Sequence, residues 1–124
     1  MRAMLLALGL LASAALAATT PPAVRAEIDT LLGRMVASAC EFNRNGSWYP
    51  ATEARTHLLK KLDYIESRGT LASAEQFIEL AASASSFSGK PYLVKCGTAA
   101  PVESRVWLTG ELKSLRAGKP GAAR

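Results

Sequence analysis

Cys40 and Cys96 are the only two cysteines in the 124-residue chain. In a secreted protein an even number of cysteines indicates disulfide bonding, and two cysteines allow a single intramolecular bridge. Such a bridge would close a loop of about 57 residues and contribute about 4 kcal/mol to stability by the chain-entropy estimate. That is a large share of the about 5–10 kcal/mol that stabilises a domain of this size. A free reactive cysteine is the alternative, but no Cys-x-x-Cys motif supports it.

The N-terminal segment predicts that the chain is secreted. Arg2 precedes the apolar run Ala3–Leu16, and the small residues Ala15 and Ala17 close it, which is the order of a signal peptide. The run has about 14 residues, whereas a membrane-spanning helix needs about 20. We therefore predict residues 1–17 as a signal peptide that is cleaved near Ala17 and leaves no transmembrane anchor. No cysteine follows the small residues, so we expect no lipid attachment.

The remaining 107 of the 124 residues are enough for one domain but not for two. Without Arg2 the formal net charge falls from +5 to +4, and the basic residues are dispersed among acidic ones. A mild positive excess of this kind favours solubility or provides a binding face for anionic polymers or lipid head groups. For a secreted chain we expect no nucleic-acid partner.

Apolar residues with a helical period predict about four helices. The period indicates helices over residues 23–39, 52–67 and 102–116. A further helix is expected to begin at Ser73, because Ser73 and Gln76 form the sequence pattern of a capping box. Residues 18–23 are expected to form a spacer, residues 24–116 a single small domain and residues 117–124 a disordered tail.

Two other segments have the features of short strands. Asn45-Gly46 is a turn dipeptide that predicts a hairpin or strand-turn after Phe42. The segment 92–96 is expected to be a strand with either Leu93 or the pair Tyr92 and Val94 facing inward. A disulfide between Cys40 and Cys96 would place these segments side by side. The predicted fold class is therefore mainly α, with four helices, a two-stranded β ribbon and one disulfide.

Five motifs occur together along the chain. They are Cys40-x-Phe42-x-Arg44-Asn45-Gly46-x-x-Tyr49, His57-Leu58 with Lys60-Lys61, Ser73-Ala74-Glu75-Gln76-Phe77-Ile78, Ala82-Ser83-x-Ser85-Ser86-x-Ser88-Gly89-Lys90-Pro91-Tyr92, and Trp107-Leu108. As a set they resemble the domain of unknown function 5329 family, small proteins secreted to the periplasm of Gram-negative bacteria. The resemblance implies a periplasmic or secreted location. Because the family has no established activity, it implies no catalytic residues.

The segment from Ser85 to Lys90 is the first candidate for a binding site. Three hydroxyls, a glycine and a lysine are able to surround an anion. The segment is not a phosphate-binding loop of the NTPase type, since Ala84 occupies the position of the first glycine of that motif. Alternatively, the serines satisfy backbone groups at the end of a helix and have a structural role.

The turn around Arg44 and Asn45 is the second candidate. Trp48 and Tyr49 follow it, and exposed aromatic side chains beside an arginine are frequent in binding surfaces. The structural alternative is a tight turn whose aromatic side chains pack on the helices.

His57 is the only histidine. We expect a structural role, with the ring bonded to a backbone carbonyl or to Glu53. The alternative is a general base that activates Ser85, Ser86 or Ser88. A metal site requires several ligands with regular spacing, and the sequence offers none.

The sequence therefore predicts a non-enzymatic binding or accessory module in the cell envelope, for an anionic ligand or a peptide or protein partner. A small serine- and histidine-dependent hydrolase is the alternative. No catalytic residue, metal or cofactor is assigned, and the disulfide is assigned to Cys40 and Cys96. The predicted binding residues come from the two candidate segments and are Arg44, Asn45, Tyr49, Ser86, Ser88, Lys90 and Tyr92.

Overall fold

The computed structural model of the chain describes residue 9 and residues 19–122. The predicted signal peptide, apart from residue 9, and the first spacer residue lie outside the described residues. In chain order the elements are α1 (Pro22–Ala37), β1 (Glu41–Arg44), β2 (Ser47–Pro50), α2 (Ala51–Glu66), α3 (Ala74–Ala81), β3 (Leu93–Lys95), β4 (Val102–Glu103) and α4 (Ser104–Arg116).

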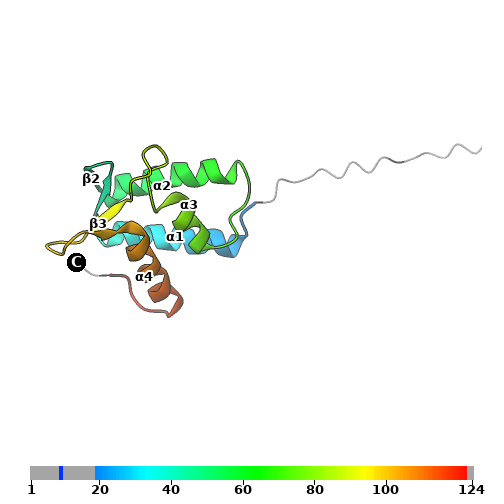
Figure 1. The fold of residues 1–124 in the computed structure, drawn as a ribbon. Helices are drawn as coiled ribbons and strands as arrows, with labels where there is room; N and C mark the ends of the chain where they lie inside the picture. Colours follow the sequence, from blue (N-terminus) through cyan, green and yellow to red (C-terminus); the bar gives the residue numbers. More distant parts are fainter. Residues whose placement is uncertain (1–8, 10–18, 123–124) are drawn as a thin grey trace, which may run out of the picture.

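The helices form a bundle with the small sheet at one end (Figure 1). Helices α1 and α2 lie side by side and run in opposite directions, because the β1–β2 hairpin connects them. Helix α3 contacts both, whereas α4 packs against α1 and α3. The predicted apolar stripe of the first helix is confirmed, since Ile28, Leu31, Leu32 and Met35 are all fully buried.

The predicted capping box at the start of α3 is present. Ser73 Oγ accepts a hydrogen bond from the backbone N–H of Gln76 at 3.1 Å. The Gln76 side chain in turn accepts one from the backbone N–H of Ala72 at 2.7 Å. Two N–H groups that would lack a partner at this helix end are thereby satisfied.

The predicted hairpin is also confirmed, with Asn45 and Gly46 at its turn. Their φ angles are 52° and 86°, so both residues are in the left-handed region. A two-residue turn with this geometry matches the twist of the flanking strands, and Asn-Gly is the sequence that adopts it at least cost. The turn places Arg44 opposite Ser47 in the register of β1 and β2.

The sheet is larger than the predicted two-stranded ribbon. The described residues form one four-stranded antiparallel sheet in the order β2-β1-β3-β4. β1 pairs on both of its sides, with Phe42 opposite Tyr49 in β2 and Val94 in β3. The expected start of the last helix at Val102 is wrong, because Val102 and Glu103 are extended and pair with β3. The fold class is therefore mixed α/β rather than mainly α.

Within β3 the second of the two predicted orientations is found. Tyr92, which precedes the strand, and Val94 are buried, whereas Leu93 and Lys95 are partly exposed. This alternation has the two-residue period of a strand with one face on the core. It directs the Tyr92 side chain into the protein.

The predicted disulfide between Cys40 and Cys96 is present, with an S–S distance of 2.06 Å. Cys40 precedes β1 and Cys96 follows β3, and the neighbouring residues Glu41 and Lys95 are paired across the two strands. The bond therefore fixes the register of β1 against β3, which are far apart in the sequence.

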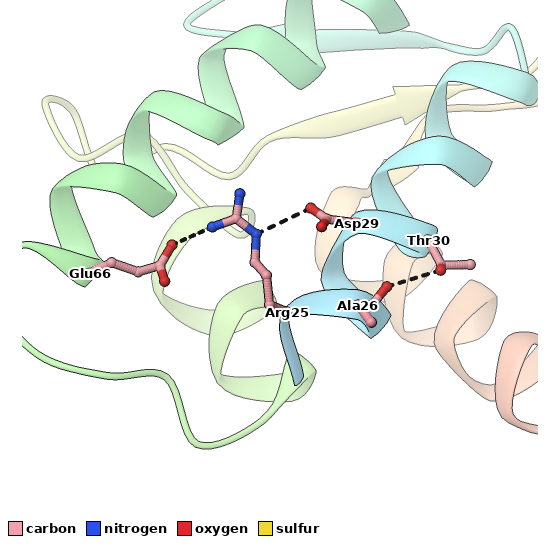
Figure 2. A network of polar contacts seen from close by, with 5 residues as sticks. All are labelled: Arg25, Ala26, Asp29, Thr30 and Glu66. Carbon is pink, nitrogen blue, oxygen red and sulfur yellow. Dashed lines mark hydrogen bonds and ion pairs between the residues drawn. The ribbon is translucent and has the colours of Figure 1, made fainter. Parts of the chain in front are cut away.

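Arg25 connects the two long helices at the end opposite the sheet. Its guanidinium donates to Glu66 on α2 at 2.6 Å and to Asp29 on α1 at 3.2 Å. Figure 2 shows the Arg25 side chain between these two carboxylates. Thr30 on the same helix donates to the carbonyl of Ala26 at 2.9 Å. Since Arg25 and Asp29 are largely exposed, we expect each of these ion pairs to contribute at most about 1 kcal/mol.

The segment after α4 was expected to be disordered. As far as residue 122 it contacts the helices: the backbone N–H of Ala122 donates to Glu111 at 3.1 Å, and Arg34 donates to the carbonyl of Lys119. Residues 123 and 124 lie outside the described residues. The sequence shows nothing of these contacts, because the composition of the segment is typical of an unstructured tail.

Candidate functional site

Tyr92 is the buried centre of a polar cluster and is only 6% exposed. Its hydroxyl oxygen lies 3.1 Å from Lys61 Nζ and 3.1 Å from His57 Nε2, both on α2. Its backbone N–H donates to the carbonyl of Ser83, and its carbonyl accepts from the N–H of Ser104. The position of the phenol is therefore fixed from the main chain and from the side chain.

His57 links Tyr92 to Arg44, whose Nη1 lies 2.6 Å from His57 Nδ1. A guanidinium only donates hydrogen bonds, so Nδ1 is the acceptor and the ring proton lies on Nε2. Nε2 then donates to the Tyr92 oxygen, which also accepts from Lys61. The Tyr92 hydroxyl hydrogen remains available to a ligand, because no acceptor among the described residues takes it.

The pKa shifts agree with this arrangement. Burial lowers the pKa of His57, and the charges of Arg44, Lys61 and Lys60 lower it further, so the ring is neutral at pH 7. Burial raises the pKa of Tyr92, and the charge of Arg44 lowers it by a smaller amount. Because the net effect is a raised pKa, the phenol stays protonated at pH 7. Burial and the charge of Arg44 lower the pKa of Lys61.

The positive charges of this cluster have no carboxylate partners in the part of the chain that the structure describes. Neither Arg44 nor Lys61 forms an ion pair with an acidic side chain there. Arg44 instead lies over the ring of Tyr49, with its guanidinium carbon 4.9 Å from the ring centre. Lys61 donates to the carbonyl of Ala84 at 3.0 Å as well as to Tyr92. We call Arg44, His57, Lys61 and Tyr92 the cation cluster.

Two cavities share the side chains of Arg44, Tyr49, His57 and Tyr92 in their walls. The smaller one has a volume of about 200 Å³, and its further lining includes Phe42, Glu53, Ala54, Leu58 and Lys60. The larger one has a volume of about 380 Å³, and its further lining is Asn45, Ser47, Lys61, Ser85, Ser86 and Phe87. The cation cluster therefore borders one cavity on α2 and a second cavity beside the serine-rich loop.

The serines of this loop mainly support its own backbone. Ser85 Oγ accepts hydrogen bonds from the N–H groups of Phe87 and Ser88, and from the Asn45 amide, all at 3.2 Å. Ser88 Oγ donates to Asn45 and accepts from the N–H of Lys90. These contacts fit the structural interpretation of Ser85 and Ser88. They also attach the loop to the β1–β2 turn.

The structure brings together most of the predicted binding residues. Arg44, Asn45, Tyr49, Ser86 and Tyr92 all line the larger cavity. Ser88 contacts this group through Asn45. Lys90 is separate from them, because it is exposed and lines neither of the two cavities.

The expected bonding of His57 is wrong. Neither a backbone carbonyl nor Glu53 holds the ring, since Arg44 and Tyr92 occupy its two nitrogens. A serine hydrolase requires a hydroxyl within hydrogen-bond reach of its base. No serine of the described residues is hydrogen-bonded to His57, and Ser85 is engaged by the loop and by Asn45.

Lys61 is a member of the cluster that is not among the predicted binding residues. The sequence does indicate that Lys61 lies near His57, because it follows His57 by four residues and the two share one face of a helix. The sequence does not show that this face meets Tyr92. Within residues 19–122, no three His, Cys, Asp or Glu side chains converge closely enough to hold a metal ion.

Fold and site together define a small disulfide-linked α/β domain with a cavity bordered by unneutralised cations. A family model matches residues 22–116, and its description is a family of unknown function, DUF5329. The chain belongs to this family, which confirms the resemblance found in its motifs.

One similar protein is the uncharacterized protein YfeK of Salmonella typhimurium strain LT2. It is 48% identical over 51 residues, which are 41% of this chain and 41% of YfeK. The matched segment thus spans about two fifths of that relative. No solved structure gives a significant match. Among the residues that the structure describes, no helix is both long enough and apolar enough to cross a membrane.

Proposed function

We propose that the chain is a non-enzymatic binding module for a small anionic ligand, and that the cation cluster is its binding site. The observation that carries this proposal is the convergence of Arg44, Lys61 and the Tyr92 hydroxyl at cavity walls without a neutralising carboxylate among the described residues. Each of the three offers hydrogen-bond donors, and an anion is the ligand that accepts from all of them.

The electrostatics of the cluster support the same proposal. Arg44 and Lys61 are like charges at one partly buried site, which disfavours the charged form of Lys61. A bound anion would remove this penalty, because it supplies the missing opposite charge. Hydrogen bonds between ionised partners contribute about 1.5–3 kcal/mol each, so two or three are enough for specific binding of a small ligand.

Binding is favoured over catalysis because no activated nucleophile is present in the cluster. Both ring nitrogens of His57 are engaged by Arg44 and Tyr92, and Ser85 and Ser88 form their hydrogen bonds within the loop and with Asn45. His57 instead holds Arg44 in position and orients the Tyr92 hydroxyl.

A titration with acetate and with inorganic phosphate, followed by NMR, tests the proposal. His57 is the only histidine of the chain, so its ring resonances in an untagged protein report on the cluster alone. We expect at least one of these anions to shift the His57 resonances in a saturable way. Failure of both anions to do so would contradict the proposal.

Two matched variants locate the site. Arg44→Gln keeps a hydrogen-bond donor for His57 but removes the charge, so we expect about tenfold weaker anion binding. Lys90→Gln removes one positive charge from an exposed position outside both cavities and should bind as the wild type does. Equal weakening in both variants would mean that only the net charge of the protein attracts the anion.

We also propose that the mature protein is secreted to the periplasm and that its partner belongs to the cell envelope. A disulfide supports an oxidising compartment, and the signal-peptide pattern of residues 1–17 supports export. N-terminal sequencing of the protein from a periplasmic extract should give Ala18 as the first residue. An intact N-terminus in the cytoplasmic fraction would contradict this part of the proposal.

A further inference from the structure

We infer that the ligand of this site is a small monocarboxylate with a short apolar group, whose carboxylate binds Arg44 and Tyr92 and whose apolar group enters the smaller cavity. This inference rests on the proposed anion-binding function and specifies its ligand class. It is carried by the shape, the charge and the lining of the cavity beside the cation cluster.

Apolar side chains form one part of the wall of the smaller cavity, which also includes Asn43, Thr56 and Ser104. Phe42 and Leu58 are buried side chains of β1 and α2, and Ala54 lies one turn before Leu58 on the same helix. The rings of Tyr49 and Tyr92 complete this part of the lining. A cavity of about 200 Å³ is below the range of about 300–1,000 Å³ typical of sites for drug-sized ligands. It therefore fits a single aliphatic or aromatic group.

The charge around the cavity fits an anion. Arg44 and Lys60 contribute two positive charges to the lining and Glu53 one negative charge. Lys61 adds a further positive charge beside Tyr92. The site therefore has an excess of positive charge, which a carboxylate reduces.

The donors at the wall of the cavity favour a carboxylate as the anionic group. The planar guanidinium of Arg44 pairs with both oxygens of a carboxylate through parallel hydrogen bonds. The Tyr92 hydroxyl, whose own hydrogen has no acceptor among the described residues, donates a further bond. Both groups line the smaller cavity, so the apolar part of a carboxylate held there has that cavity next to it.

A carboxylate beside an apolar group has two sources, a free short-chain acid and the C-terminal residue of a peptide. Isovalerate represents the first, and the peptide acetyl-Ala-Ala-Leu with a free C-terminus represents the second. Acetate has the charge without the apolar group, and isovaleramide has the apolar group without the charge. The four probes are titrated against the full-length oxidised protein, and the His57 resonances are recorded.

We expect isovalerate or the peptide to bind at least about tenfold more tightly than acetate, because burial of an isobutyl group adds to the carboxylate contacts. Isovaleramide should give no saturable shift. The tighter of the first two probes identifies the source of the ligand. If acetate binds but neither larger carboxylate binds more tightly, the inference is wrong and the proposed function stands. If no anion binds, both are wrong.

The variant Ala54→Leu tests the place of the apolar group. A larger side chain at this half-buried position fills part of the smaller cavity without a change of charge. We expect the preference for isovalerate over acetate to be lost, and circular dichroism shows separately whether the variant is folded. A preserved preference in a variant that binds acetate would place the apolar group elsewhere.

Discussion

Arg34 and Arg44 are partly buried arginines with different surroundings. On the face between α1 and α4, Arg34 lies 3.6 Å from Glu111, and the two side chains are only 16% and 8% exposed. Arg44 belongs to the cation cluster. Its neighbours are a neutral histidine and an aromatic ring, and it has no carboxylate partner among the described residues.

The C-terminal segment, residues 117–122, covers Arg34 but not Arg44. It covers the Arg34–Glu111 pair, since the carbonyl of Lys119 accepts from Arg34 and the N–H of Ala122 donates to Glu111. No comparable segment among the described residues covers the cation cluster, which instead borders two cavities. We infer that the first group of charges stabilises the fold, and we propose that the second binds a ligand.

The largest change in stability is expected when the ion pair between Arg34 and Glu111 is broken. In Glu111→Gln, Arg34 keeps its charge at a mostly buried position without a counterion, which we expect to lower the free energy of unfolding by about 3 kcal/mol. Urea denaturation measures this change. Acetate binding under conditions where the variant is folded should be unaffected. A loss below about 1 kcal/mol would mean that the Arg34–Glu111 pair does not stabilise the fold more than an exposed ion pair does.

The corresponding change in the cation cluster should affect binding instead of stability. Arg44→Gln removes a charge that no carboxylate of the described residues balances, so we expect the free energy of unfolding to change by less than about 1 kcal/mol. Its loss of anion affinity, about tenfold, corresponds to about 1.4 kcal/mol. Urea denaturation of Arg44→Gln beside Glu111→Gln compares the two sites directly. Equal destabilisation by the two variants would remove the distinction between them.

Removal of residues 117–124 is expected to lower the free energy of unfolding by less than Glu111→Gln does. A chain that ends at Arg116 loses the hydrogen bonds from Arg34 to Lys119 and from Ala122 to Glu111. Because water replaces these partners, we expect a loss of about 1–2 kcal/mol in urea denaturation. The shift of the His57 resonances on addition of acetate should be unchanged. A changed shift would show that the two regions are coupled.

The smallest effect expected is the dependence of anion binding on pH. Burial first, and then Arg44, Lys61 and Lys60, lower the pKa of His57, so the unfolded chain binds a proton more readily than the free folded protein. The contribution of the neutral ring to stability is therefore present above pH about 6.5 and declines as the pH falls towards the lowered folded-state pKa.

A bound anion favours the charged ring, because it supplies a negative charge beside it. We thus expect acetate to bind about threefold more tightly at pH 5.5 than at pH 7, measured by NMR titration. In His57→Gln, where backbone amide resonances replace the missing histidine as the reporter, this dependence should disappear, because the glutamine amide does not titrate in this range. Weaker binding at the lower pH in the wild type would mean that loss of the Nδ1 acceptor for Arg44 outweighs the added positive charge of the ring.

The sequence predicts the local features of this fold well. The apolar stripe of α1, the capping box at Ser73 and the Asn45-Gly46 turn each depend on residues close together in the chain. The disulfide is also predicted, since two cysteines leave a single intramolecular pairing. Family membership follows from the motifs and is confirmed by the family model.

The features that the sequence did not reveal depend on contacts between distant residues. Val102 and Glu103 are extended because they pair with β3, and nothing in their local pattern distinguishes them from the first turn of α4. Lys61 belongs to the cation cluster only because α2 presents it to Tyr92, which β1 and the disulfide hold in register. A pattern of residues along one helix does not contain that information.

The pairing of β1 with β3 also has a kinetic consequence. The disulfide spans a sequence separation of 56 residues, and α2 and α3 lie within it. Closing this loop costs chain entropy before the strands gain any contacts, so we expect the reduced chain to fold more slowly than the oxidised one. Arg44 and Tyr92 belong to the two strand regions that this closure unites. The cation cluster is therefore expected to be completed late in folding, after the helices have formed.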